Sequence, residues 1–234
     1  MTTILRAWAE AALDIFFPPA CVGCGVLGTA PLCPACEALS EPAAPLRIDG
    51  VDEAVAIWRY GEPIDRALHR LKYRDAPHIA RPLAEALRVV CAPLTFDLVV
   101  PIPLAAARLR HRRFNQAREL ARRLAPVDVD ALIRTRETMS QVGRSFAERH
   151  RNLRDAFSAD PARICGRSVL VVDDVVTTGA TVTEAARTLY AAGAKSVVVA
   201  TVAAVSDDRC SDGVDQSRQV VGSSPYERGN EFVA

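Results

Sequence analysis

The stretch Ser168–Thr181 reads SVLVVDDVVTTGAT and decides the fold. It opens with a short continuous apolar run, Val169 to Val172, which is typical of a parallel strand buried on both faces. Two aspartates and a Thr-Thr-Gly turn follow. The apolar residues after the turn recur at helical spacing: Val182, Ala185, Ala186 and Leu189. SVVVATVAAV then supplies another strand, so the pattern predicts a βαβ unit and an α/β fold built on a parallel sheet.

The two aspartates, Asp173 and Asp174, precede a turn of the kind that binds phosphate. Such a turn offers backbone N–H groups and hydroxyls at a helix N-terminus, here from Thr177, Thr178, Gly179, Ala180 and Thr181. Carboxylates repel phosphate, so they need a different partner on the same ligand. Neutral hydroxyls beside the phosphate, with a divalent cation nearby, would satisfy them at the carboxyl end of a parallel strand. A ribose 5-phosphate has this chemistry.

Other interpretations of this stretch need no ligand or a different one. A strand, a turn and a helix cap would give the same residues without any binding site. A signalling receiver domain also has an acidic pair after its first strand, but too few residues follow Asp174 for the strands that it requires. The nucleotide-binding patterns G-x-x-x-x-G-K-[ST] and G-x-G-x-x-G are absent from the sequence.

Four cysteines near the N-terminus form two C-x2-C pairs: Cys21, Cys24, Cys33 and Cys36. Four thiolates at this spacing can converge on one tetrahedral ion, and Zn2+ suits that soft ligand set. A segment so short and so rich in Pro and Gly cannot build its own core, which favours a metal over four unliganded cysteines. A redox pair is weaker, because neither pair ends a strand that leads into a helix. We expect a structural zinc ribbon over residues 18–40.

The rest of the chain divides around these two features. Residues 1–17 place apolar side chains at helical spacing and predict an amphipathic helix, too short in its apolar run to enter a membrane, so we expect a cytoplasmic protein. Residues 41–50 are expected as a linker, 51–205 as the main domain, and 206–234 as a disordered tail. Further strands are predicted within 52–60, 96–104 and 127–134, and further helices within 63–74, 78–92, 114–125 and 145–157.

Positive charge is concentrated in one part of the chain. The formal net charge is only +1, yet thirteen arginines and five carboxylates lie between Ala105 and Arg154. A local excess of this kind attracts anions. Lysine is scarce, because only Lys72 and Lys195 occur.

VLVVDDVVTTGAT closely resembles the thirteen-residue phosphoribosyl diphosphate motif of type I phosphoribosyltransferases, in which four hydrophobic residues and two acids precede a T-T-G-x-T loop. Other stretches add to this motif: the cysteine ribbon, LKYRD, VPIPL, RHRRFNQA and RTRETMSQVG…ERHRNLRDAF. Taken together, they resemble the ComF (ComF/GntX) family of competence-associated proteins, over roughly residues 13–205. The family usually has R-G-F-N-Q, and here Arg113 replaces the glycine.

The resemblance implies a type I phosphoribosyltransferase-like parallel sheet flanked by helices, with a small N-terminal zinc ribbon. It also implies an enzyme that binds phosphoribosyl diphosphate with Mg2+ and transfers the phosphoribosyl group to a nitrogen acceptor, a pentosyl transfer. In that family Asp173 and Asp174 would contact the ribose hydroxyls, and Thr177 to Thr181 would bind the 5-phosphate. The diphosphate would meet Pro101, Ile102 and Pro103. A mobile loop from Arg134 to Gly143 would close over the site, and Arg136 and Arg144 would neutralise the departing diphosphate.

The link of the family to natural transformation implies a second class of function. The protein would then be a nucleic-acid-binding accessory of DNA uptake that keeps its phosphoribosyl diphosphate site for ligand sensing. Single-stranded DNA or a competence helicase-like protein would be its partner. A bound strand prefers Arg-rich surfaces with stacking aromatics, and the aromatics within the basic segment are Phe114, Phe146 and Phe157. The sequence nominates no acceptor for the transfer.

Overall fold

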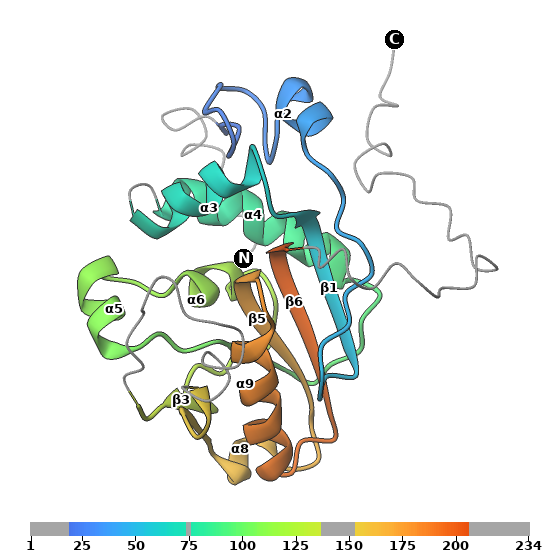
Figure 1. Ribbon diagram of the computed structural model, residues 1–234, viewed down its shortest axis with the longest axis vertical. Coiled ribbons are helices and arrows are strands. Elements are labelled where there is room, and N and C mark those ends of the chain that lie inside the picture. The colour runs from blue at the N-terminus through green and yellow to red at the C-terminus, as the bar shows by residue number, and fades with distance from the viewer. Residues whose placement is uncertain (1–18, 74–75, 137–152, 206–234) are drawn as a thin grey trace, which may run out of the picture.

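The computed structural model describes residues 19–73, 76–136 and 153–205 (Figure 1). Its main sheet has four parallel strands in the order β1-β6-β5-β2. They are β1 (Glu53–Arg59), β2 (Leu98–Pro101), β5 (Ser168–Val176) and β6 (Ser196–Ala204). Two short strands, β3 (Leu132–Arg134) and β4 (Phe157–Ala159), pair antiparallel in a separate sheet. The predicted α/β fold with a parallel sheet is therefore confirmed.

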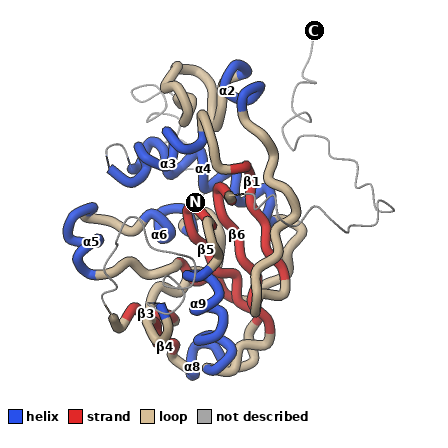
Figure 2. The backbone as a smooth tube through the Cα atoms, in the orientation of Figure 1, coloured by secondary structure: helices blue, strands red, loops and turns tan. Residues whose placement is uncertain are grey.

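Helices cover both faces of the main sheet (Figure 2). One face packs against α3 (Ile64–Tyr73), α4 (Ala76–Cys91) and α6 (Gln116–Ala121), and the other against α9 (Ala180–Ala191) with β3 and β4. The remaining described helices are α2 (Pro34–Leu39), α5 (Ala106–Arg112) and α8 (Pro161–Ile164). The apolar positions that predicted a helix after the Thr-Thr-Gly turn, among them Ala185 and Leu189, are the buried positions of α9.

Strand β5 continues past the apolar run that marked it in the sequence. We expected the aspartates to follow the strand, but β5 extends to Val176, because Asp173 and Val175 pair with Thr201 and Ala203 of the equally long β6. Side chains along a strand alternate between the two faces. Leu170 and Val172 lie in the core with α3 and α4. Val175 packs against the same cluster as Leu170 and Val172, so this alternation does not continue through the aspartates, whose side chains lie close enough to interact.

The cysteine-rich segment is not a separate lobe. Its side chains belong to the same hydrophobic cluster as α3 and α4. A Cβ at Gly23 would lie 2.9 Å from Cβ of Pro63, just before α3, so only glycine allows this close approach. The Arg70 Nη1 of α3 also donates to the Val22 carbonyl at 3.3 Å. Figure 1 shows α2 above α3 at this end of the molecule.

The segment 41–50, expected as a linker, runs antiparallel along β1. Ala43 N–H donates to the Ile57 carbonyl at 3.2 Å, and Arg59 N–H donates to the Glu41 carbonyl at 2.8 Å. Leu46 forms a further bridge with Ala54. The segment thereby covers the exposed edge of the sheet, an edge that would otherwise be free to pair with another chain.

Several sequence-based expectations lie wholly or largely outside the described residues: the amphipathic helix at 1–17, the helix within 145–157 and the tail at 206–234. Within the described ranges, no helix combines the length and apolar character needed to cross a membrane. Arg113, which stands where the family usually has glycine, ends α5 with φ 65°. This left-handed conformation explains the glycine of the family, because glycine adopts it without steric cost.

Candidate functional site

A recess opens at the carboxyl end of β5, where the Thr-Thr-Gly turn leads into α9. It is lined by Asp173 together with residues 175–182. Gly179 has φ 75° and caps α9 without a side-chain hydrogen bond. No described residue accepts a hydrogen bond from the N–H groups of Ala180, Thr181 or Val182. Free N–H groups at the N-terminus of a twelve-residue helix suit an anion such as phosphate.

Asp173 is the carboxylate that lines this recess. Its Oδ1 accepts a hydrogen bond from the Asp174 N–H at 2.8 Å. Burial and the charge of Asp174 raise the pKa of Asp173 well above its usual value, while attraction to Lys72 acts in the opposite direction. A hydroxyl or a cation of a bound ligand would stabilise the charged form of this partly buried carboxylate.

Asp174 contacts α3. Its Oδ2 is 2.6 Å from Nζ of Lys72, and the two side chains are only 13% and 21% exposed. The structure therefore brings one of the two expected acids into the recess and pairs the other with a lysine. The sequence analysis gave Lys72 no role, although LKYRD was among the stretches that carried the resemblance.

Arg134, named above only as the start of the expected mobile loop, lies near Asp173. Arg134 ends β3, and its guanidinium carbon is 5.3 Å from the centre of the Phe157 ring. Burial, and then the positive charge of Arg108, lower the pKa of Arg134, while the charge of Asp173 acts in the opposite direction. A bound anion would offset the repulsion between these two like charges.

The diphosphate residues expected from the resemblance are less favourably placed. Pro101 and Pro103 have no N–H, and Ile102 N–H already donates to the Val172 carbonyl at 2.9 Å. These three residues therefore offer no backbone donor to a diphosphate. Arg136 is exposed and its Nη1 donates to the Arg154 carbonyl at 3.4 Å. Arg144 lies outside the described residues.

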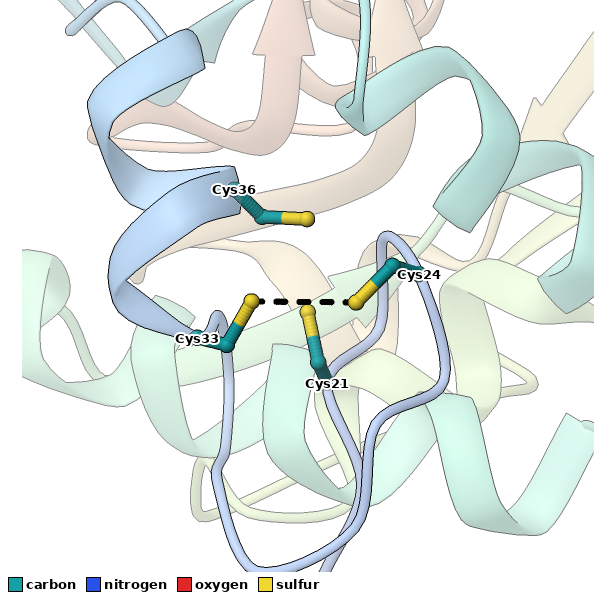
Figure 3. Close-up of side chains that lie close together, drawn as sticks. All are labelled: Cys21, Cys24, Cys33 and Cys36. Carbon is teal, nitrogen blue, oxygen red and sulfur yellow. Dashed lines mark hydrogen bonds between the residues drawn. The ribbon is translucent and has the colours of Figure 1, made fainter.

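The four cysteines of the N-terminal segment converge, as expected (Figure 3). All four sulfur atoms lie within 4.8 Å of one another, and Sγ of Cys24 and Sγ of Cys33 are 3.7 Å apart. Tetrahedral Zn2+ with Zn–S bonds of about 2.3 Å places its sulfurs about 3.8 Å apart. Three of the cysteines are buried and Cys24 is exposed. The donor set and its spacing fit a structural zinc ion.

The backbone around the cysteines favours thiolate. Burial opposes ionisation of Cys21, but the N–H groups of Cys24, Cys33 and Gly23 outweigh it and lower the pKa of Cys21 to about 6. Burial, hydrogen bonds with the other three thiols and the charge on Cys21 raise the pKa of Cys36 to about 12. The lowered pKa favours the thiolate of Cys21 at neutral pH, and a divalent ion would supply the charge that stabilises thiolate ligands.

An exposed aromatic ring lies in the basic region of the surface. Tyr73, the last residue of α3, is 49% exposed. The Arg112 guanidinium carbon is 5.1 Å from the centre of its ring, and Arg112 Nη2 donates to its hydroxyl at 3.3 Å. The rings of His69 and His111 lie 4.8 Å and 6.3 Å away, centre to centre. Because α3 precedes the Arg-rich segment in the sequence, the aromatics counted within that segment did not include Tyr73.

Comparisons with known proteins identify the family of the chain. Residues 81–229 match the family model of the phosphoribosyl transferase domain. The DNA utilization protein YhgH of Escherichia coli strain K12 is 34% identical over 191 residues, covering 76% of this chain and 81% of the relative. Competence protein F of Haemophilus influenzae is 32% identical over 162 residues, covering 63% of this chain and 71% of the relative.

Among solved structures, the glutamine phosphoribosylpyrophosphate amidotransferase of B. subtilis overlaps 52% of this chain and 26% of its own. The identity is 24% and the TM-score 0.36, an overlap too loose to carry weight. The family model and the sequence relatives are sufficient, because they cover most of the chain and agree with the expected resemblance. The chain belongs to the phosphoribosyl transferase domain family, in its competence-associated ComF branch.

Proposed function

We propose that the protein binds phosphoribosyl diphosphate with Mg2+ and transfers the phosphoribosyl group to a nitrogen acceptor. The observation that carries this proposal is the recess at α9, where free N–H groups and the carboxylate of Asp173 lie side by side. The turn from Thr177 to Thr181 would hold the 5-phosphate. The ribose hydroxyls would donate hydrogen bonds to Asp173, which accepts them as a carboxylate.

In the proposed reaction the nitrogen of the acceptor attacks ribose C1. A C–N bond forms, the bond from C1 to the diphosphate oxygen breaks, and the diphosphate leaves with the electron pair. The acceptor nitrogen loses its proton to solvent. The chain contributes positioning and electrostatic stabilisation, and Arg134 is one described cation near Asp173. Mg2+ would neutralise charge on the diphosphate, and Asp173 is the carboxylate of the recess that fits beside such a cation.

Replacing Asp173 by Ala tests this proposal directly. We expect affinity for phosphoribosyl diphosphate to fall by about 10- to 100-fold, because a charge-assisted hydrogen bond contributes roughly 1.5–3 kcal/mol. Binding to the unaltered protein should also weaken as the pH falls through the raised pKa of Asp173, because protonation removes the negative charge that strengthens these hydrogen bonds. Calorimetric titration with and without Mg2+ measures both effects.

Asp97→Ala is the matched control, because Asp97 lies at the amino end of the same sheet, where its Oδ2 accepts from the Ser168 N–H at 2.8 Å. This variant should bind phosphoribosyl diphosphate as the unaltered protein does. If the unaltered protein shows no Mg2+-dependent binding, or if Asp173→Ala binds equally well, the recess is only a strand, a turn and a helix start.

A second candidate function is the binding of single-stranded DNA in DNA uptake, and the Tyr73 cluster favours it. The relatives named for DNA utilization and competence suggest the same partner. Tyr73 would stack on a base while Arg112 and the other arginines of α5 meet phosphates. A basic surface with a stacking aromatic is what such a strand requires, and the fold places the two together.

Tyr73→Ala should weaken binding of a single-stranded oligonucleotide by about 5- to 100-fold, because stacking contributes about 1–3 kcal/mol per base. Tyr73→Phe should retain the affinity. Tyr60, 43% exposed and just after β1, provides the control variant Tyr60→Ala. Fluorescence anisotropy at several salt concentrations measures the affinity, which should fall steeply with salt. Equal affinities for the two Ala variants, or binding that salt does not change, would count against this function.

A further inference from the structure

Residues 46–52, which lead into β1, contact α9 at both of its ends. Three apolar side chains of this segment are partly buried against the hydrophobic cluster that includes α9: Leu46, Ile48 and Val51. In the last turn of α9, the Tyr190 hydroxyl donates a hydrogen bond to Oδ2 of Asp52. The same oxygen accepts a hydrogen bond from the Val197 N–H at 2.7 Å. Asp52 thereby fixes the segment to the end of α9 and to the start of β6.

At the other end of α9, Ile48 lies against Gly179 of the Thr-Thr-Gly turn. A Cβ at Gly179 would be 3.4 Å from Cγ2 of Ile48 and 4.0 Å from its Cγ1. Both Cγ carbons of the isoleucine therefore cover the side of the glycine from which a side chain would project. The recess is lined by Asp173 and residues 175–182, so Ile48 touches the turn from outside the recess.

The Thr-Thr-Gly turn has few contacts of its own that could fix its shape. No described residue accepts a hydrogen bond from the N–H groups of Thr177, Thr178 or Gly179. A glycine also has more backbone freedom to lose than any other residue. The β-branched side chain of Ile48 is stiff, and its packing against Gly179 limits that freedom. The contact therefore stabilises the conformation of the turn that forms the recess.

We propose that Ile48 is a positioning residue of the phosphate-binding turn: its Cγ carbons hold Gly179 in place before the ligand binds, while Asp52 fixes the segment that carries it. The inference rests on the function proposed above. It places a determinant of that function before residue 81, where the match to the phosphoribosyl transferase domain begins. The sequence analysis assigned Ile48 only to the expected linker at 41–50.

Substitutions of Ile48 separate the contact with Gly179 from the filling of space. Ile48→Val keeps both carbons that approach Gly179 and should bind ribose 5-phosphate and phosphoribosyl diphosphate as the unaltered protein does. Ile48→Leu keeps the volume but loses the Cγ2 methyl, so its affinity for both ligands should fall. Ile48→Ala loses both carbons, and its affinity should fall by about 5- to 30-fold, which corresponds to the cost of ordering the backbone of one residue.

Leu46→Ala is the matched control, because Leu46 packs against the same cluster and forms a bridge with Ala54 of β1. This variant should lower the melting temperature as Ile48→Ala does, but it should leave both affinities unchanged. Titration calorimetry gives the affinities, and thermal melting followed by circular dichroism gives the stabilities. If Ile48→Ala does not fold, the comparison of Ile48→Val with Ile48→Leu carries the test.

The outcomes distinguish this inference from the function on which it rests. Lack of binding by the unaltered protein would overturn that function. If the unaltered protein binds but Ile48→Leu and Ile48→Ala bind as tightly as Ile48→Val, the inference alone is overturned. The same holds if affinity falls in step with melting temperature across all the variants, Leu46→Ala included, because Ile48 would then only stabilise the fold.

Discussion

Removing the metal from the cysteine cluster should destabilise α3 and its neighbours as well as the ribbon. A structural Zn2+ contributes about 10–16 kcal/mol of apparent free energy at pH 7, which is comparable to the whole stability of a typical domain. The ribbon shares its hydrophobic cluster with α3 and α4, and Gly23 lies against Pro63 at the start of α3. We therefore expect Cys36→Ser, or treatment with a chelator, to unfold the ribbon and loosen α3.

The measurements for this prediction are metal content, thermal melting and hydrogen exchange. Protein purified without chelators should contain one zinc per chain, and Cys36→Ser should contain none and melt at a much lower temperature. Amide protection in α3 should fall along with that of the ribbon. Cys165→Ser is the control, because Cys165 is exposed and lies outside the cluster. Absence of zinc, or equal melting of the two variants, would contradict the prediction.

The consequence should reach the recess at the carboxyl end of β5, since α3 carries Lys72, which pairs with Asp174 beside it. A ribbon that has lost its metal no longer holds the Val22 carbonyl against Arg70, two residues before Lys72. We expect chelated protein to bind phosphoribosyl diphosphate more weakly even where circular dichroism still reports a folded sheet. The zinc ribbon would then support the site through one helix, rather than act as an independent module.

Features written in short local patterns could be predicted from the sequence. The unit β5–α9–β6 follows from an apolar run, a turn and a helical period within a single stretch, so it needs no knowledge of distant residues. The cysteine cluster could be predicted for a similar reason, because the short spacing within and between the two C-x2-C pairs places four sulfur ligands close together. In both cases the sequence separation is small, and the local geometry decides which atoms meet.

Features that depend on packing could not be predicted in the same way. Lys72 meets Asp174, and Tyr73 meets Arg112, only because α3 lies over the carboxyl end of the sheet beside α5. The hydrophobic periodicity of a helix does not indicate which strand end that helix will cover. The extent of β5 is a further example, since its pairing with β6 keeps Asp173 and Asp174 inside the strand.

Replacing Gly179 by Val should nearly abolish binding of phosphoribosyl diphosphate. Gly179 has φ 75°, a conformation that a β-branched residue adopts only as an outlier, and a Cβ there would lie 3.4 Å from Cγ2 of Ile48. The turn must therefore change, and the N–H groups of Ala180 and Thr181 move with it. Losing two charge-assisted hydrogen bonds to the phosphate costs about 3–6 kcal/mol, a loss of affinity of about 100-fold or more.

Gly166→Val distinguishes a lost phosphate site from general backbone strain. Gly166 has the same φ of 75° but nothing lies within 4 Å of its Cβ position, and it precedes β5 at the amino end of the sheet. Both variants should therefore carry a similar strain and a similar fall in melting temperature. Calorimetry with ribose 5-phosphate and with phosphoribosyl diphosphate should show lost binding for Gly179→Val alone. Equal affinities for both variants and the unaltered protein would mean that the turn caps α9 and holds no phosphate.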